Sequence, residues 1–150
     1  SGRRSGMIRK ALIIIGIILT LSSMGCTPTR ENGGVTGVSQ DEMIKFSWKL
    51  SSISGNRIEK GNITLSFLTE SKSISGVSVI NSYFGNYTRN GKNIKISISG
   101  LTKMAGPEED MELEQKYIRL LEDVTTIEES NNEMILRTEK EELKFVKQNN

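Results

Sequence analysis

The sequence predicts an α+β fold: a curved antiparallel sheet of about seven or eight short strands with one helix packed on it. From Asp41 onward, short stretches alternate apolar and polar residues with the period of half-buried strands. One stretch, residues 107–124, instead repeats its apolar residues at the spacing of an amphipathic helix. A single helix has to bury its apolar stripe, and the sheet is the available partner.

The first strand is predicted from "FSWKLS", where Phe46, Trp48 and Leu50 fall on one side. The dipeptide Asn90-Gly91 predicts a tight hairpin, because both central positions of such a turn favour positive φ. Further strands group their apolar residues in the same way, as Ile63, Leu65 and Phe67, as Val77 and Val79, and as Ile94, Ile96 and Ile98.

The predicted helix begins near Pro107, which suits the first helical position because an N–H there would have no partner. The acidic residues Glu108, Glu109 and Asp110 complement the positive end of the helix dipole. The apolar stripe consists of Leu113, Tyr117, Leu120, Leu121 and Val124. A closing hairpin follows, which turns at "TEKEE" and faces Met134, Leu136, Leu143 and Phe145 inward.

Residues 1–25 are expected to be a cloning remnant followed by a lipoprotein-type signal peptide. "SGRRSG" precedes Met7, the expected natural start, and the basic pair "RK" precedes the apolar run Ala11–Leu21. This run is shorter than the roughly 20 apolar residues that a membrane-spanning helix needs. An ordinary signal peptide or an uncleaved anchor is the alternative.

Cys26 is the only cysteine of the chain, and it follows the small residue Gly25 behind this segment. The placement resembles the lipobox of bacterial lipoproteins, in which signal cleavage leaves a lipidated cysteine as the first residue. Ser23 and Met24 depart from the usual lipobox pattern. The resemblance implies lipidation of Cys26, and two or more acyl chains anchor a protein stably. Residues 26–42, rich in Thr, Gly and Ser, are expected to form a flexible tether.

The basic charge of the chain belongs to its first segment. The whole chain has a net charge of +2, but residues 1–25 hold four basic residues and no acidic one, which leaves −2 for the remainder. Surfaces that bind nucleic acid cluster basic residues on one face. The sequence therefore predicts no nucleic-acid partner.

The chain contains no histidine, and its lone cysteine is assigned to the anchor. Zinc sites built from Cys and His, and catalysis by a histidine base, are therefore excluded. The carboxylate pairs Glu108–Asp110, Glu128–Glu129 and Glu141–Glu142 are interpreted as a helix N-terminus and two solvated turns rather than acid–base catalysts. No metal or cofactor site is predicted, and the chain is expected not to be an enzyme.

Three motifs occur in order along the predicted domain: "WKLSSI", then "ITLSFLTESKSISGVSVINSYFGNYT", then "ISGLTKMAG" before the acidic helix. This order resembles the META domain family (HslJ-like), which implies that residues 43–148 form a META domain. The resemblance places Asn81, Thr102, Met104 and Ala105 at family-motif positions with a structural role.

Two departures from the family pattern concern cysteine. Many members carry one cysteine before the motif asparagine and another after Met-Ala, where this chain has Ile80 and Gly106. Their joint absence is expected if the two cysteines pair with each other in the relatives that have them. Because losing a disulfide typically costs about 2–5 kcal/mol, other packing has to compensate here.

Aromatic residues gather in "SYFGNY", where Tyr83 and Phe84 point to opposite faces if the strand continues. One interpretation is core and rim packing near a bend at Gly85. The other is a partner or ligand groove on the concave face of the sheet, because the META fold resembles pilot lipoproteins that hold lipid or a peptide there. That groove would comprise Trp48, Tyr83, Phe84 and Tyr87.

These patterns predict a non-enzymatic cell-envelope protein, exported and held at the periplasmic or cell-surface face of a membrane by a lipid anchor on Cys26. Its META domain, expected to be monomeric, would bind a protein or lipid partner in a stress or envelope-maintenance role. The alternative is a structural or inhibitory module, for instance an inhibitor of an extracytoplasmic protease. An exposed apolar groove favours the first, and a flush polar surface with one protruding loop favours the second. An enzyme using carboxylates alone would need two acidic side chains in one partly buried pocket.

Overall fold

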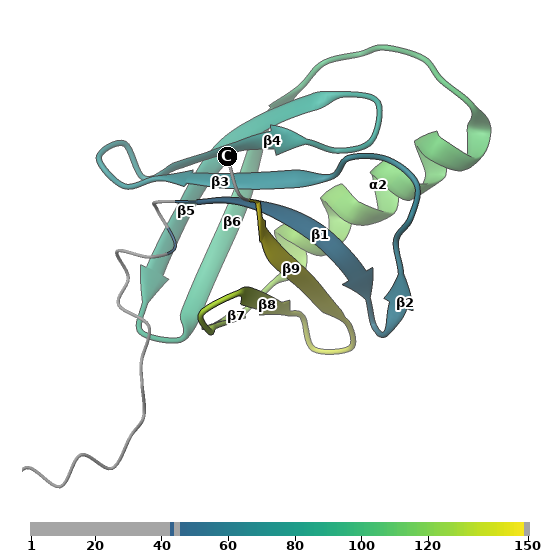
Figure 1. The fold of residues 1–150 in the computed structure, drawn as a ribbon. Helices are drawn as coiled ribbons and strands as arrows, with labels where there is room; N and C mark the ends of the chain where they lie inside the picture. The colour runs from purple at the N-terminus through teal and green to yellow at the C-terminus, as the bar shows by residue number, and fades with distance from the viewer. Residues whose placement is uncertain (1–42, 44–45, 149–150) are drawn as a thin grey trace, which may run out of the picture. The chain divides into compact units, whose positions relative to one another are not determined.

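The computed structural model describes Met43 and residues 46–148, and this part of the chain holds nine strands and one long helix (Figure 1). The predicted signal segment and tether lie outside the described residues. The elements are β1 (Ser47–Ile53), β2 (Asn56–Arg57), β3 (Thr64–Leu68), β4 (Ser73–Val77), β5 (Ser82–Asn90), β6 (Asn93–Leu101), α2 (Glu108–Asp123), β7 (Thr126–Glu129), β8 (Glu133–Arg137) and β9 (Glu142–Gln148).

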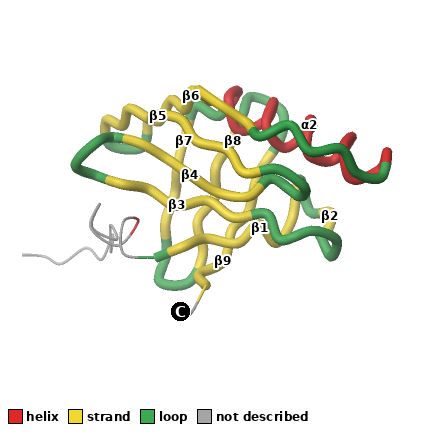
Figure 2. Tube along the Cα trace, turned by 90° about the horizontal axis from the view of Figure 1, so that it is seen from above, coloured by secondary structure: helices red, strands yellow, loops and turns green. Residues whose placement is uncertain are grey.

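All strand pairs are antiparallel, and the sheet closes on itself. Its order runs β1-β3-β4-β5-β6-β7-β8-β9, and β9 pairs again with β1 along nearly its whole length. The two-residue strand β2 folds back onto the end of β1. Seen from above, the strands surround a common interior (Figure 2). The predicted α+β architecture, a curved antiparallel sheet with one helix, is confirmed.

The closed sheet is weakest between β6 and β7, which share the single pair Asn93↔Thr126. The helix α2 connects these two strands and packs along the side of β6 that β7 leaves unpaired. There the backbone N–H of Ile98 donates a hydrogen bond to Oε1 of Glu122 at 3.3 Å. The helix therefore occupies the place where the sheet would otherwise present an open edge.

The interior is filled by the side chains that the strand and helix periods predicted. Tyr117 of α2 is completely buried, and its ring packs edge-on against Tyr83 and against Phe145. Of the predicted helical stripe only Leu113 is partly exposed. Each such buried side chain stabilises the fold by about 1.5–3 kcal/mol. The inward positions of the closing hairpin are confirmed, since Met134, Leu136, Leu143 and Phe145 have no exposed surface.

Two local predictions were wrong. The strand assigned to Val77 and Val79 lies earlier, as β4, and Val79 follows it with a φ of 126°. The hairpin at Asn90-Gly91 exists, but its two central residues are Gly91 and Lys92, because Asn90 still pairs with Asn93. Among the described residues of this turn only Gly91 has positive φ, at 60°, which fits a turn that needs glycine at its first central position.

Candidate functional site

A buried carboxylate joins the helix to the loop between β4 and β5. Glu114 of α2 is 5% exposed. Its Oε2 accepts hydrogen bonds from Ser78 Oγ at 2.8 Å, from the Ile80 N–H at 3.1 Å and from the Asn81 N–H at 2.9 Å. Its Oε1 accepts one from Asn81 Nδ2 at 2.6 Å. A single helical side chain thus accepts hydrogen bonds from four donor groups of this loop.

The same hydrogen bonds set the protonation state of Glu114. Burial by itself raises the pKa of this carboxyl, but the bonds from Asn81, Ser78 and Ile80 favour the charged form and outweigh it. The pKa of Glu114 therefore lies below its usual value, and the side chain is ionised at neutral pH. Because every donor around it is neutral, the negative charge is held by dipoles and not by a cation.

Asn81 also forms hydrogen bonds with the loop that follows β6, and so connects this loop to Glu114. Its Oδ1 accepts hydrogen bonds from Thr102 Oγ1 at 2.9 Å and from the Met104 N–H at 2.7 Å, and its Nδ2 also donates to the Met104 carbonyl at 3.2 Å. Both backbone groups of Met104 are therefore fixed by one side chain, while the Met104 side chain is 58% exposed. We call residues 102–107 the Met104 loop and the Glu114–Asn81–Met104 chain of contacts the clamp.

The residues at the family-motif positions meet in this clamp. Asn81, Thr102 and Met104 are in direct contact, and Ala105 lies exposed next to them in the same loop. Sequence reasoning missed Glu114, although a signal was present. This residue lies three positions before Tyr117 and seven before Leu121, so it falls on the buried face of the helix. A carboxylate there requires hydrogen-bond donors from another part of the chain.

Ile80 and Gly106 also meet at the Met104 loop. A Cβ on Gly106 would overlap the end of the Ile80 side chain, whose two γ-carbons lie 3.0 and 3.7 Å from it. The two positions at which many relatives have cysteine are thus direct neighbours, and here an isoleucine packs over a glycine. This apolar contact lies where the family pattern leads us to expect packing in place of a disulfide.

The four aromatic residues proposed for a groove do not share one surface. Trp48, Tyr83 and Tyr87 are buried inside the sheet, where the Trp48 indole N–H donates to the Met43 carbonyl at 3.2 Å and Tyr87 packs edge-on against Phe67. Phe84 points the other way and is 59% exposed. The concave face is occupied by the core, so it offers no open groove among these residues.

The opposite end of β5 carries a second buried charge, at a position interpreted from sequence as a solvated turn. Glu129 lies in β7 and faces inward, and its Oε1 forms an ion pair with Arg89 Nη1 at 2.6 Å. Arg89 Nη1 also donates to the sulfur of Met43 at 3.2 Å. The interpretation was wrong because the short strand β7 was not recognised. Glu114 and Glu129 lie at opposite ends of β5, so these two carboxylates do not share a pocket.

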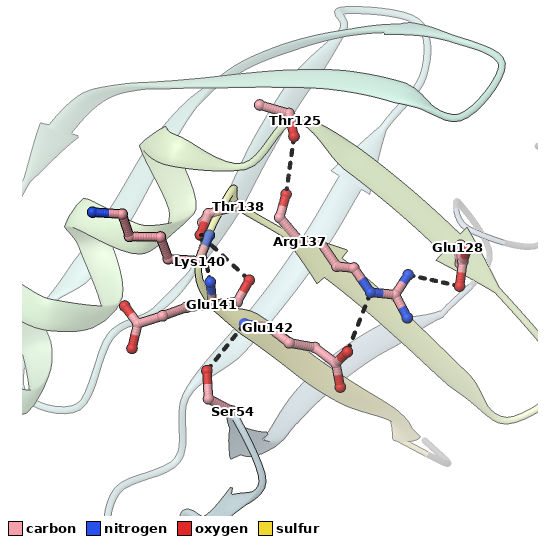
Figure 3. A network of polar contacts seen from close by, with 8 residues as sticks. All are labelled: Ser54, Thr125, Glu128, Arg137, Thr138, Lys140, Glu141 and Glu142. Atoms are coloured by element: carbon pink, nitrogen blue, oxygen red, sulfur yellow. Dashed lines mark hydrogen bonds and ion pairs between the residues drawn. The ribbon is translucent and has the colours of Figure 1, made fainter.

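The neighbouring Glu128 faces outward and belongs to a surface network around the β8–β9 turn (Figure 3). Arg137 contacts Glu128 Oε2 at 2.7 Å and Glu142 Oε2 at 3.2 Å. The hydrogen bond from Arg137 lowers the pKa of Glu128. The hydroxyl of Thr138 closes the turn by accepting from the N–H of Glu141 at 2.9 Å. Open hollows beside this turn are lined by side chains of both charges, and they gather no set of groups suited to one ligand.

The described residues contain no group of three or more His, Cys, Asp or Glu side chains placed to hold a metal ion. In the same part of the chain, no helix combines the length and the apolar character that crossing a membrane would take.

The fold and the clamp define a small α+β domain built on one closed antiparallel sheet with a helix in its gap. A family model for the META domain matches residues 41–150. The chain belongs to the META domain family, as the order of its motifs predicted.

Solved structures share this fold. An NMR structure of a protein from Burkholderia xenovorans is 25% identical, with a TM-score of 0.59 over 73% of this chain and 86% of that one. A DUF4847 family protein from Bacteroides vulgatus is 14% identical, with a TM-score of 0.55 over 73% of this chain and 98% of that one. A search of curated proteins gave no match.

We expect Glu114→Gln to lower the free energy of unfolding by about 2–3 kcal/mol, because a charged acceptor is replaced by an amide whose NH₂ faces donors. The effect should depend on pH. The folded-state pKa of Glu114 is lowered, so its contribution is complete above the usual carboxyl pKa and is lost as the pH falls through the lowered value. Urea unfolding at several pH values measures this. Glu112→Gln, at an exposed position of the same helix, is the control and should change little.

We expect Ile80→Cys combined with Gly106→Cys, in a Cys26→Ser background, to form a disulfide. The Ile80 γ-carbons lie close enough to a Cβ on Gly106 for a sulfur at that place to reach its partner. The bond should raise the free energy of unfolding by about 2–4 kcal/mol, and a reductant should remove the gain. Unfolding with and without dithiothreitol measures it, beside the two single variants. Two free thiols in the oxidised double variant would contradict the geometry.

Proposed function

We propose that this chain is a non-enzymatic, lipid-anchored protein of the cell envelope, whose META domain binds a protein partner in a stress or envelope-maintenance role. The observation that carries the proposal is the placement of Cys26. It is the only cysteine, it follows an apolar run and a small residue, and a tract rich in Thr, Gly and Ser separates it from the domain. A lipid on its sulfur would hold the domain at a membrane surface.

The packing of the domain supports a partner that binds outside the sheet. The side chains facing the interior, including Trp48, Tyr83 and Tyr87, are at most a few per cent exposed. A lipid acyl chain in this space would have to displace a close-packed core, which is costly. We therefore favour a protein over a lipid as the partner.

The position of the Met104 loop, far along β5 from Met43, supports a binding role for the loop. Met43, the first described residue, contacts Arg89 near the end of β5. Asn81, which holds the loop, directly precedes the start of the same strand. At about 3.3 Å per residue, the eight steps from Asn81 to Arg89 separate the two ends by roughly 25 Å. The Met104 loop is therefore well separated from Met43 along β5, so a tether joined at Met43 would leave the loop clear for a partner.

The second candidate function, an inhibitory module, is favoured by the form of this loop. Residues 102–107 are all exposed, and the backbone at Met104 is fixed from beneath by Asn81. A loop already held in one conformation loses little entropy when it enters a cleft, which is the physical requirement for a tight inhibitor. The partner would then be an enzyme with an apolar pocket for an unbranched side chain.

Lipidation is tested by expressing the full chain in a bacterium supplied with labelled palmitate. We expect the wild-type chain to incorporate label and to fractionate with membranes, because Cys26 provides the sulfur that accepts the lipid. Cys26→Ser should lose the label, because serine provides no sulfur to accept the lipid. Equal labelling of the two proteins would contradict lipidation of Cys26. It would not affect the proposal that the META domain binds a partner.

Partner binding is tested by co-purification from solubilised membranes followed by mass spectrometry. We expect proteins retained by the wild-type chain to be lost, by roughly tenfold or more, from Met104→Lys, because a charge at the apex opposes burial in an apolar pocket. Leu68→Lys, which places the same charge at another exposed apolar position, is the matched control. A partner set unchanged by Met104→Lys would contradict the loop's role. A captured protease whose activity falls on adding the chain would select the inhibitory candidate.

A further inference from the structure

Charge is distributed very unevenly over this domain. The four strands β3–β6 contain only two charged residues, Arg89 and Lys95, and Arg89 points inward to Glu129. By contrast, nine of the sixteen residues of α2 are charged. The outer side of β3–β6 is therefore a nearly uncharged surface on a highly charged chain.

The strand registers define what this surface displays. Ser66, Ser75, Phe84 and Gly100 form one row across the four strands, and Leu68, Ser73, Asn86 and Ser97 form the next. Hydroxyl and amide groups thus surround Phe84, and Asn86 Nδ2 donates to Ser99 Oγ at 3.3 Å beside it. We call this outer surface the serine face, with the members Ser66, Leu68, Ser73, Ser75, Ser82, Phe84, Asn86, Thr88, Lys95, Ser97, Ser99 and Gly100.

Phe84 is the aromatic residue of the serine face, and its ring is held against the sheet. A Cβ on Gly100 would overlap Cε1 and Cζ of the ring, so the ring lies over the glycine directly across the strand pair. With 59% of its surface exposed, Phe84 remains accessible from outside. Glycine at position 100 is what allows the ring to lie so close to the backbone.

The chemistry of the serine face fits a sugar better than a protein. Hydroxyl and amide side chains both donate and accept hydrogen bonds, as the hydroxyls of a saccharide do. An aromatic ring offers a negative π-face to the C–H groups of a pyranose ring. Protein–protein interfaces, in contrast, are depleted in serine and enriched in Tyr, Trp, Phe, Met and Arg, and the serine face has many serines around a single aromatic residue. Lys95 is the one outward-facing charged side chain of these four strands, so the surface suits a ligand with little or no charge.

We propose that the serine face binds an uncharged polysaccharide chain, with a sugar ring stacked on Phe84 and its hydroxyls bonded by Ser75, Asn86 and Ser99. This inference goes beyond the proposed function. It rests on neither the lipid anchor nor the Met104 loop, and it would give the domain a second ligand on a different surface.

The test is affinity electrophoresis of the full chain in a polyoxyethylene detergent, because detergents with sugar headgroups would compete. Native gels contain laminarin, dextran, galactomannan or hydroxyethyl cellulose, with carboxymethyl cellulose as the charged comparison. We expect retardation in at least one neutral gel. Phe84→Leu, which keeps an apolar side chain but removes the ring, should weaken that retardation by roughly tenfold, whereas Phe84→Tyr should keep it.

Two further variants make the outcome decisive. Gln115→Ala removes an exposed amide on α2, outside the serine face, and should leave retardation unchanged. Asn86→Ala, at an exposed position, should weaken it without affecting the ring, and urea midpoints verify that each variant is folded. The inference is overturned if no neutral gel retards the protein, or if Phe84→Leu and the wild type are retarded equally. It is also overturned if only the charged polymer retards the protein. Phe84-dependent capture of a protein, without any polysaccharide binding, would likewise contradict it.

Discussion

The hydrogen bonds between the carboxylate of Glu114 and the amide groups of Asn81 are the interaction on which the rest of the domain depends. They join three segments that are distant in sequence: the β4–β5 loop, the Met104 loop and α2. The helix fills the gap beside β6, and this contact fixes its position along that strand. Removing Glu114 would leave several buried donors unsatisfied, each at a cost of about 1–3 kcal/mol. The geometry of the loop and the closure of the sheet are thus supported by the same few atoms.

The two ends of β5 use charge in different ways. At one end Glu114 is held by neutral donors, and at the other Glu129 is paired directly with Arg89. Between them the strand alternates buried tyrosines with an exposed outer row that carries Phe84. The polar constraints therefore lie at the ends and the apolar packing lies in the middle. The outward-facing side chains of β5 take no part in the core or in these buried polar contacts. Their residue types are therefore not set by the packing of the interior.

The sequence predicted what depends on neighbouring residues and missed what depends on distant ones. Alternation located Leu65, Phe67 and Ile96 correctly, because the period of a strand is local. It misplaced β4, since the inward position after Ile74 is Gly76, which lacks a side chain to mark it. A Cβ there would overlap the Thr64 carbonyl and lie 2.7 Å from the Tyr83 hydroxyl, so the space belongs to a residue on another strand.

The predicted groove illustrates the same limit. Alternation correctly separates Tyr83 from Phe84, but it cannot say which side of the strand becomes the interior. That choice follows from the pairing of β1 with β9, which brings Ser47 beside Gln148 and closes the concave side. Likewise Glu114 was recognisable as a carboxylate on a buried helical face, but its donors are more than thirty residues away. Closure of the sheet and burial of the Glu114 charge both depend on contacts between residues that are distant in the sequence. The local sequence pattern therefore does not reveal them.

The Ile80–Gly106 contact shows how this chain keeps its Met104 loop ordered without a covalent link. At the two positions where the family resemblance leads us to expect cysteines, an isoleucine side chain packs over a glycine, and Glu114 and Asn81 add hydrogen bonds to the loop. A disulfide constrains a loop at any pH, whereas the clamp is strongest only while Glu114 is ionised. The order of the loop is therefore tied to the charge of one carboxylate. Glu114 thus acts on the exposed Met104 loop through Asn81, from a buried position on the helix.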